Sequence, residues 1–160
     1  MGTRSHTNII EKFKDTRTGK QSQVLLVSIY RQYDGYPSGM GKDLAEWLSK
    51  VKVVNGLSGG YPDGVIVCNG AGCLAAQLIK ELKDGAGNIY ITKPNPNNAG
   101  VNYTYDIVVD FDTHEVTLKA YDVDGYYNKK KEYCARRKKI YEGSAADFIN
   151  VYLKKEEQEA

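Results

Sequence analysis

Runs of strand-forming residues that come in pairs are the feature that most constrains this fold. Residues 8–13 and 23–30 are apolar runs separated by the polar segment 14–20, which contains a glycine, and this pattern predicts a β-hairpin with a longer loop. Residues 103–107 and 116–120 alternate apolar and polar side chains, as half-buried antiparallel strands do. Because hairpins join antiparallel neighbours, these pairs predict a mainly antiparallel sheet.

Three further runs, 65–68, 88–92 and 131–141, complete the predicted strands. The run 24–30 is almost continuously apolar, which is typical of a strand buried on both faces. We therefore expect that strand to lie in the centre of the sheet.

Three amphipathic helices are inserted between these strands without regular alternation. Their apolar residues recur at helical spacing: Leu44, Trp47, Leu48 and Val51; Leu74, Leu78, Ile79 and Leu82; and Ala145, Phe148, Ile149 and Tyr152. Ser144 with Asp147 three residues later resembles a capping box, although Glu or Gln is the usual partner. Paired strands with irregularly inserted helices predict an α+β fold with a mainly antiparallel sheet.

The length of 160 residues fits one domain, since domains span roughly 100–200 residues. We expect a single α+β domain over residues 1–153 and a charged C-terminal tail over residues 154–160 that frays. The chain carries 22 Lys and Arg against 20 Asp and Glu, a net charge of +2. This balance predicts no strong field for nucleic acid over the molecule as a whole.

The beginning of the chain carries no apolar leader, and no window reaches the roughly 18 apolar residues of a membrane span. We therefore expect a cytoplasmic protein that does not contact a membrane.

The aromatic residues are unusual, because 13 are Tyr and only 3 are Phe. Tyr combines an apolar ring with a polar hydroxyl and suits half-buried ligand walls and interfaces.

The residues that usually carry catalysis or hold metals are few and scattered. His6 and His114 are isolated, and no nucleophile with an orienting partner lies near either in the sequence. Cys68, Cys73 and Cys134 do not have the short spacing of a zinc site and are interpreted as buried thiols. We predict no catalytic residue, no metal site and no cofactor.

Two glycine-rich loops each lead into a predicted helix, where backbone N–H groups favour an anion. The loop before Lys42 lacks the glycine and the hydroxyl residue that a P-loop needs, since Tyr36 and Asp43 occupy those positions. The loop at residues 69–72 resembles a dinucleotide fingerprint but lacks the acidic residue after the next strand. Neither motif predicts a nucleotide-hydrolysing or NAD-dependent enzyme, and the sequence does not tell whether the loops form one site.

The first loop has the composition of a nucleotide pocket. Arginine offers a donor fork for phosphate, tyrosine offers a ring for stacking, and glutamine and aspartate can read a base or a ribose. The candidate ligand-binding residues there are Arg31, Gln32, Tyr33, Asp34, Tyr36, Ser38, Gly39 and Lys42. In the alternative interpretation, Arg31 pairs with Asp34 and the tyrosines only pack the loop.

A basic segment covers residues 129–139, in which seven basic residues accompany one acid. Such a run is typical of a solvated edge strand, and it is also compatible with phosphate contact by a nucleic-acid-binding surface. Arg136 in this segment and Arg4 near the N-terminus are outside candidates for ligand binding.

The segments IYRQYDGYPSG (residues 29–39) and NGAGCLAAQL (residues 69–78) resemble a family of small uncharacterised proteins encoded by bacteriophages and some giant viruses. Residues 2–5 also look like the start of those proteins. The resemblance covers the first half of the chain closely and the strand at residues 103–107 loosely. It implies a viral gene product acting in the cytoplasm of an infected bacterium, and it brings no assigned activity or catalytic residues.

The leading hypothesis is a non-enzymatic viral binding protein that sequesters a small anionic, nucleotide-derived signal of host defence. Pockets of this kind often form between subunits, so a homo-oligomer is compatible with this hypothesis. The alternative is an accessory protein that binds nucleic acid or a host protein through residues 129–139. A metal-dependent hydrolase that uses Asp or Glu is a third hypothesis, which turnover of the ligand would reveal.

Overall fold

The computed structural model describes residues 2–57, 59–93 and 100–159. The strands are β1 (Ser5–Lys14), β2 (Gln21–Arg31), β3 (Val51–Val54), β4 (Ile66–Asn69), β5 (Ile89–Thr92), β6 (Tyr103–Asp110), β7 (Val116–Tyr127) and β8 (Tyr133–Gly143). The helical segments are η1 (Pro37–Gly41), α1 (Lys42–Leu48), α2 (Gly70–Leu82), α3 (Ala145–Asp147), η2 (Phe148–Leu153) and α4 (Lys154–Glu159), where η marks a π-helical segment.

A six-stranded sheet in the order β5-β2-β1-β6-β7-β8 dominates the molecule. Its neighbouring strands are antiparallel, except that β1 and β6 run parallel in the middle of the sheet. A separate parallel pair, β3 and β4, precedes α2. The prediction of an α+β fold with a mainly antiparallel sheet is confirmed.

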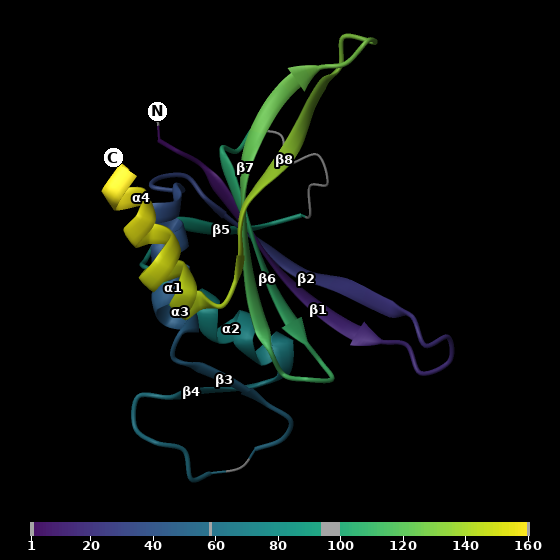
Figure 1. Ribbon diagram of the computed structural model, residues 1–160, viewed down its shortest axis with the longest axis vertical. Helices are drawn as coiled ribbons and strands as arrows, with labels where there is room; N and C mark the ends of the chain where they lie inside the picture. The colour runs from purple at the N-terminus through teal and green to yellow at the C-terminus, as the bar shows by residue number, and fades with distance from the viewer. Residues whose placement is uncertain (1, 58, 94–99, 160) are drawn as a thin grey trace.

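The helices gather on one side of the large sheet and enclose the core (Figure 1). Ile9, Ile29, Ile107 and Leu118 come from four different strands and have no exposed surface. They pack with fully buried helix residues, namely Leu44, Leu74, Leu78 and Phe148. Burial of each such side chain contributes about 1.5–3 kcal/mol to stability, so the predicted helix faces supply much of the driving force.

Strand β6 is buried on both faces, so the prediction that residues 103–107 are half-buried is wrong. Asp106 points to the face opposite the core and is only 5% exposed. Its carboxylate accepts a hydrogen bond from Asn8 Nδ2 at 2.9 Å and ion-pairs with Arg137 Nη1 at 3.1 Å. The guanidinium of Arg137 also lies 3.8 Å from the centre of the Tyr121 ring. A satisfied polar network therefore covers the middle of the second face.

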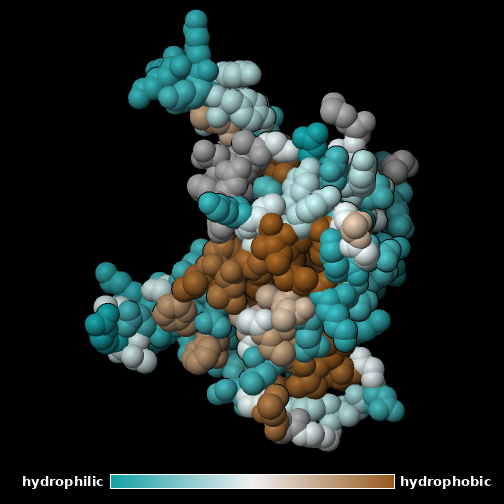
Figure 2. Space-filling model, turned by 180° about the vertical axis from the view of Figure 1, so that it is seen from behind, coloured by the Kyte–Doolittle hydropathy of each residue, from teal (hydrophilic) through white to brown (hydrophobic). Residues whose placement is uncertain are grey.

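Strand β2 does not have the central, buried position that its apolar sequence predicts. Only the end of β2 near Ile29 is buried, whereas Val24, Leu25 and Leu26 are 46%, 37% and 42% exposed. The β1–β2 hairpin extends past the helices, so no layer of helix covers these residues (Figure 1). Figure 2 shows the opposite side of the molecule, where a hydrophobic area lies between two projecting hairpins.

Two elements differ from the predicted helix boundaries. Helix α1 ends at Leu48, and Val51, the last residue of its predicted apolar stripe, begins β3 instead. Ser144 caps the C-terminal helix as predicted, because its side chain accepts a hydrogen bond from the Asp147 backbone N–H at 3.1 Å. That helix continues through α4 to Glu159, where the sequence predicts a fraying tail.

Close packing fixes the loop between β2 and α1. A Cβ atom on Gly35 would lie 2.8 Å from the Arg4 carbonyl carbon, and one on Gly41 would lie 2.9 Å from the Phe148 ring. The Tyr105 hydroxyl donates a 2.7 Å hydrogen bond to the Gly35 carbonyl oxygen. Only glycine fits at these two positions without movement of the neighbours, so the loop is held against β1 and β6.

Replacing Tyr105 with Phe leaves the buried Gly35 carbonyl without its donor. We expect a loss of about 1–3 kcal/mol in the free energy of unfolding, measured by urea denaturation. The matched control is Tyr127→Phe, on a side chain that is 72% exposed, and it should change stability little. Equal stability of the two variants would contradict the anchoring role of Tyr105.

Burial lowers the pKa of His6 below its ordinary value. The unfolded chain therefore binds a proton at higher pH than the folded one, and the free energy of unfolding falls as pH drops from about 7 towards 5. We expect His6→Phe to remove this part of the pH dependence in denaturation curves recorded across that range. Thr16→Ala, at an exposed residue of the β1–β2 turn that does not titrate, is the control and should retain the full dependence.

Candidate functional site

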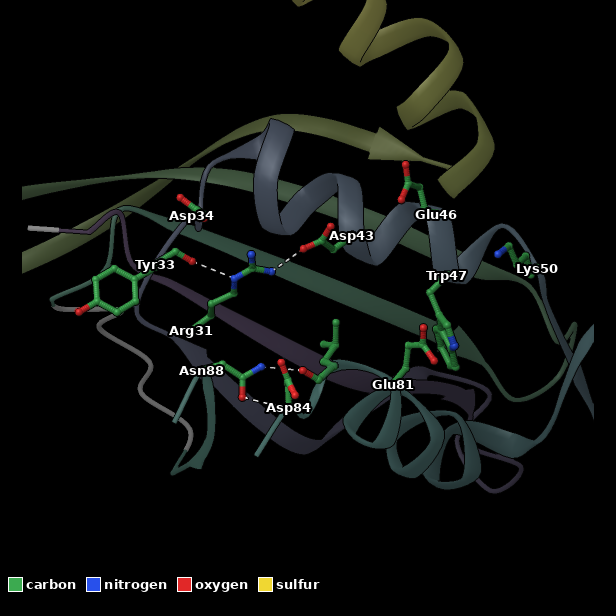
Figure 3. A pocket seen from close by; sticks show the side chains of 11 residues that line it. Arg31, Tyr33, Asp34, Asp43, Glu46, Trp47, Lys50, Glu81, Asp84 and Asn88 are labelled. Atoms are coloured by element: carbon green, nitrogen blue, oxygen red, sulfur yellow. Dashed lines mark hydrogen bonds and ion pairs between the residues drawn. The ribbon is translucent and has the colours of Figure 1, made fainter. Parts of the chain in front are cut away.

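A cavity of about 550 Å³ opens between α1 and the end of α2. We call it the α1–α2 cavity. Its lining comes from the end of β2, the following loop, α1, α2 and the segment before β5, and comprises Arg31, Tyr33, Asp34, Asp43, Glu46, Trp47, Lys50, Glu81, Leu82, Asp84 and Asn88. Figure 3 shows these side chains around a common space.

Arg31 is held in place within this cavity by two contacts. Its Nη1 lies 2.7 Å from Asp43 Oδ2, and its Nε donates to the Tyr33 carbonyl oxygen at 2.8 Å (Figure 3). The alternative that Arg31 pairs with Asp34 is wrong, because Asp43 takes that role. Asp34 instead accepts a 3.1 Å hydrogen bond from the Tyr36 hydroxyl, and this bond raises the pKa of Tyr36.

The structure brings only some of the predicted ligand-binding residues together. Arg31, Tyr33 and Asp34 line the α1–α2 cavity, whereas Gln32, Tyr36, Ser38, Gly39 and Lys42 do not. Lys42 forms an exposed ion pair with Glu46 at 3.9 Å.

Arg4 and Arg136 also lie outside the lining of this cavity. The Arg4 backbone N–H donates to Asn102 Oδ1, which fixes the N-terminal segment beside β6. Arg136 belongs to the β7–β8 hairpin, where it pairs with Asp124 at 3.1 Å.

Sequence reasoning missed most of the acidic lining. Asp43 and Glu46 lie on the exposed side of the α1 stripe, and their helical spacing relative to Trp47 was a usable signal. Glu81, Asp84 and Asn88 lie about 50 residues after Arg31, and no local pattern links them to it. Only the docking of α2 beside α1 brings these groups together.

The electrostatics of the α1–α2 cavity oppose an anionic ligand. Five carboxylate residues and two cationic residues line it, which leaves a net charge of −3. The charge of Arg31 is already offset by Asp43. The sequestration of an anionic signal stays a prediction, and this cavity gives it no electrostatic support.

The second glycine-rich loop opens on a different cavity. Gly70, Ala71 and Gly72 line a space of about 270 Å³ together with residues that include Glu11 and Phe111. None of the residues at positions 35–41 lines this cavity. The second glycine-rich loop therefore opens on a cavity distinct from the α1–α2 cavity.

The most prominent charged feature is the outer part of the β7–β8 hairpin, residues 122–139, which we call the basic ribbon. It projects beyond the helices and the rest of the sheet (Figure 1) and appears as a hydrophilic extension in Figure 2. It contains seven basic and three acidic residues, a net charge of +4 against +2 for the whole chain. The remainder of the chain is therefore acidic, and the positive charge is concentrated on this hairpin.

Ion pairs engage only part of this charge. Arg136 pairs with Asp124, Arg137 with Asp106, and Lys139 with Glu142 at 2.8 Å. The other lysines of the basic ribbon are Lys129, Lys130, Lys131 and Lys138, and none of them forms an ion pair with any residue of the described chain. Their ammonium groups remain available to an external anion.

Exposed tyrosines accompany these lysines near the tip. Tyr126, Tyr127 and Tyr133 are 40%, 72% and 51% exposed. The Tyr127 and Tyr133 rings pack edge to face with centroids 5.5 Å apart, and the Arg136 guanidinium lies 5.1 Å from the centre of the Tyr126 ring. The basic segment is evident in the sequence, but its association with these tyrosines is not, because strand pairing brings 126–127 beside 133–134.

The potential metal ligands of the chain are its His, Cys, Asp and Glu side chains, and its thiols are those of Cys68, Cys73 and Cys134. Within the described ranges, no three His, Cys, Asp or Glu side chains form a group that could hold a metal ion. Burial raises the pKa of the Cys68 thiol to about 11, which disfavours the nucleophilic thiolate. Cys73 and Cys134 are half-buried, so the prediction of buried thiols is correct for Cys68 alone.

None of the helices in the described part of the chain is long and apolar enough to cross a membrane. Comparison of the chain with protein-family models, curated proteins and solved structures gave no match. The function is therefore inferred from the geometry and charge of the α1–α2 cavity and the basic ribbon.

Proposed function

We propose that this protein binds single-stranded nucleic acid through the basic ribbon. The observation that carries the proposal is the coincidence of unpaired lysines and exposed tyrosine rings at the tip of one projecting hairpin. Lysines neutralise backbone phosphates and release counterions, while aromatic rings stack on bases of any sequence. The lysines and tyrosines together match the phosphates and the exposed bases of a single strand.

Single-stranded nucleic acid fits these residues better than a duplex does. A tyrosine ring stacks on a base only where that base is unpaired. Because stacking and phosphate contact dominate over base-edge hydrogen bonds, the binding is expected to tolerate many sequences.

The base of the ribbon is built to hold it in one orientation. Arg137 binds both oxygens of the buried Asp106 carboxylate at 3.1 Å and stacks on Tyr121. This contact ties β8 to β6 across the intervening β7. A fixed ribbon loses little conformational freedom on binding, which favours affinity.

Replacing Lys129, Lys130 and Lys131 with Ala removes three unpaired charges from the turn of the ribbon. In fluorescence anisotropy titrations with a labelled single strand, we expect weaker binding and a smaller salt dependence. The slope of log K against log salt should fall by about 0.7 for each phosphate that the variant no longer neutralises. The matched control replaces Lys14, Arg17 and Lys20 with Ala, which removes the same charge from the β1–β2 hairpin.

Equal effects of the two triple variants would mean that net charge alone causes binding and would contradict a site on the ribbon.

The tyrosines supply an independent arm of the same experiment. Tyr127→Ala should weaken binding by about 1–3 kcal/mol because stacking is removed, whereas Tyr127→Phe should bind like the unmodified protein. Tighter binding to duplex than to single strand would favour phosphate contact without stacking.

A second candidate function is the non-enzymatic retention of a small ligand in the α1–α2 cavity. Three residues expected to bind a nucleotide, Arg31, Tyr33 and Asp34, do line this one space. Tyr33 is 59% exposed and offers a ring for stacking, and carboxylates accept hydrogen bonds from ribose hydroxyls. The resemblance to phage proteins makes a host defence signal one class of ligand to test.

Calorimetric titration distinguishes uncharged from anionic ligands of this cavity. The excess of carboxylates predicts that uncharged nucleosides bind more tightly than cyclic dinucleotides or ADP-ribose derivatives. The double variant Glu46→Gln with Asp84→Asn should reduce this difference in affinity. Lys50→Gln, which removes one of the cavity's two cations, should have the opposite effect. Tighter binding of the anionic ligands, recovered chemically unchanged, would support sequestration of an anionic signal instead.

A further inference from the structure

Within residues 2–57, 59–93 and 100–159, the outer edge of β2 has a neighbouring strand over only part of its length. Strand β5 pairs only with residues 28–31 of β2, and β1 lies on the other side. Among the described residues, no strand pairs with this outer edge over residues 21–27. The backbone N–H and C=O groups that point outwards there have no partner strand in the described part of the chain, and such groups can pair with another chain.

The side chains of this segment favour pairing with another strand and do not hinder it. Val24, Leu25 and Leu26 are each more than one third exposed, and Ile91 of the adjoining β5 is 68% exposed. Residues 21–30 contain no charged side chain and no proline, although 26% of the whole chain is charged. The opposite edge of the same sheet, β8, carries four basic residues between positions 136 and 139. Charged side chains of that kind prevent strands from pairing at an edge, and residues 21–30 of β2 lack them.

We propose that a second copy of this chain pairs with this edge, so that β2 of one protomer runs antiparallel to β2 of the other. Pairing of a strand with itself about a two-fold axis must be antiparallel, and it places the same surface on both sides of the interface. The segment Val24–Val27 has the sequence VLLV, which reads the same in both directions. Apolar side chains therefore meet apolar side chains across the axis.

Charge favours a second copy over an unrelated charged peptide. An uncharged strand has no ionic group with which to select a charged partner, and it meets no like-charge repulsion when it meets itself. The pairing also leaves the basic ribbon free, because β2 and β8 lie near opposite edges of the sheet. The proposal is thus independent of nucleic-acid binding.

Light scattering during gel filtration of the full chain tests the association. At about 100 µM, where an association in the micromolar range is nearly complete, we expect twice the mass of one chain. Leu25→Lys and Leu26→Lys each place a charge on the edge and should yield monomers. The control is Leu57→Lys, at a residue that is 94% exposed in the β3–β4 loop, and it should remain dimeric. Circular dichroism verifies that all variants are folded.

Hydrogen exchange then locates the contact. Protection of amides in the peptide that covers residues 21–27 should be greater at high protein concentration and fall on dilution to the level that pairing with β1 alone provides, and in Leu25→Lys it should stay at that lower level at every concentration. A monomer at high concentration would overturn the proposal. A dimer without protection of residues 21–27, or one that survives both lysine substitutions, would also overturn it.

Discussion

The parallel pairing of β1 with β6 is the contact on which the rest of the structure depends. It joins two hairpins, β1–β2 and β6–β7, whose paired residues are about 98 positions apart in the chain. On one face it places Ile9 beside Ile107 in the core beneath the helices. On the other face it places Asn8 beside Asp106, where Arg137 completes the network. Without this pairing, neither the core nor the base of the basic ribbon would be assembled.

This arrangement also separates the charge of the molecule. The body of the sheet and its helices carry an excess of acid, which is concentrated around the α1–α2 cavity. The basic ribbon carries more positive charge than the whole chain does. An approaching polyanion is therefore attracted to the ribbon and repelled from the cavity, and the two proposed functions differ in the ligand charge that they require.

Much of the fold follows from local patterns. The apolar stripe of α2, the cap at Ser144 and the two hairpins are all visible in the sequence, because each involves one segment or two consecutive strands. The errors lie where distant segments meet. The apolar run of β2 indicated a central strand, but its outer half extends past the helices and stays exposed. The alternating pattern of residues 103–107 indicated a half-buried strand, but Asp106 on its second face is buried and pairs with Arg137 of β8.

The candidate sites show the same division. The sequence alone determined that a glycine-rich loop precedes a helix near residues 31–42 and that residues 129–139 form a basic segment, since both are properties of contiguous residues. Only the tertiary structure decided that Asp43 offsets Arg31, that α2 adds Glu81 and Asp84 to the same cavity, and that β5 leaves most of the β2 edge uncovered. Electrostatic potential and burial depend on distance in space, and the pairing of distant strands sets those distances.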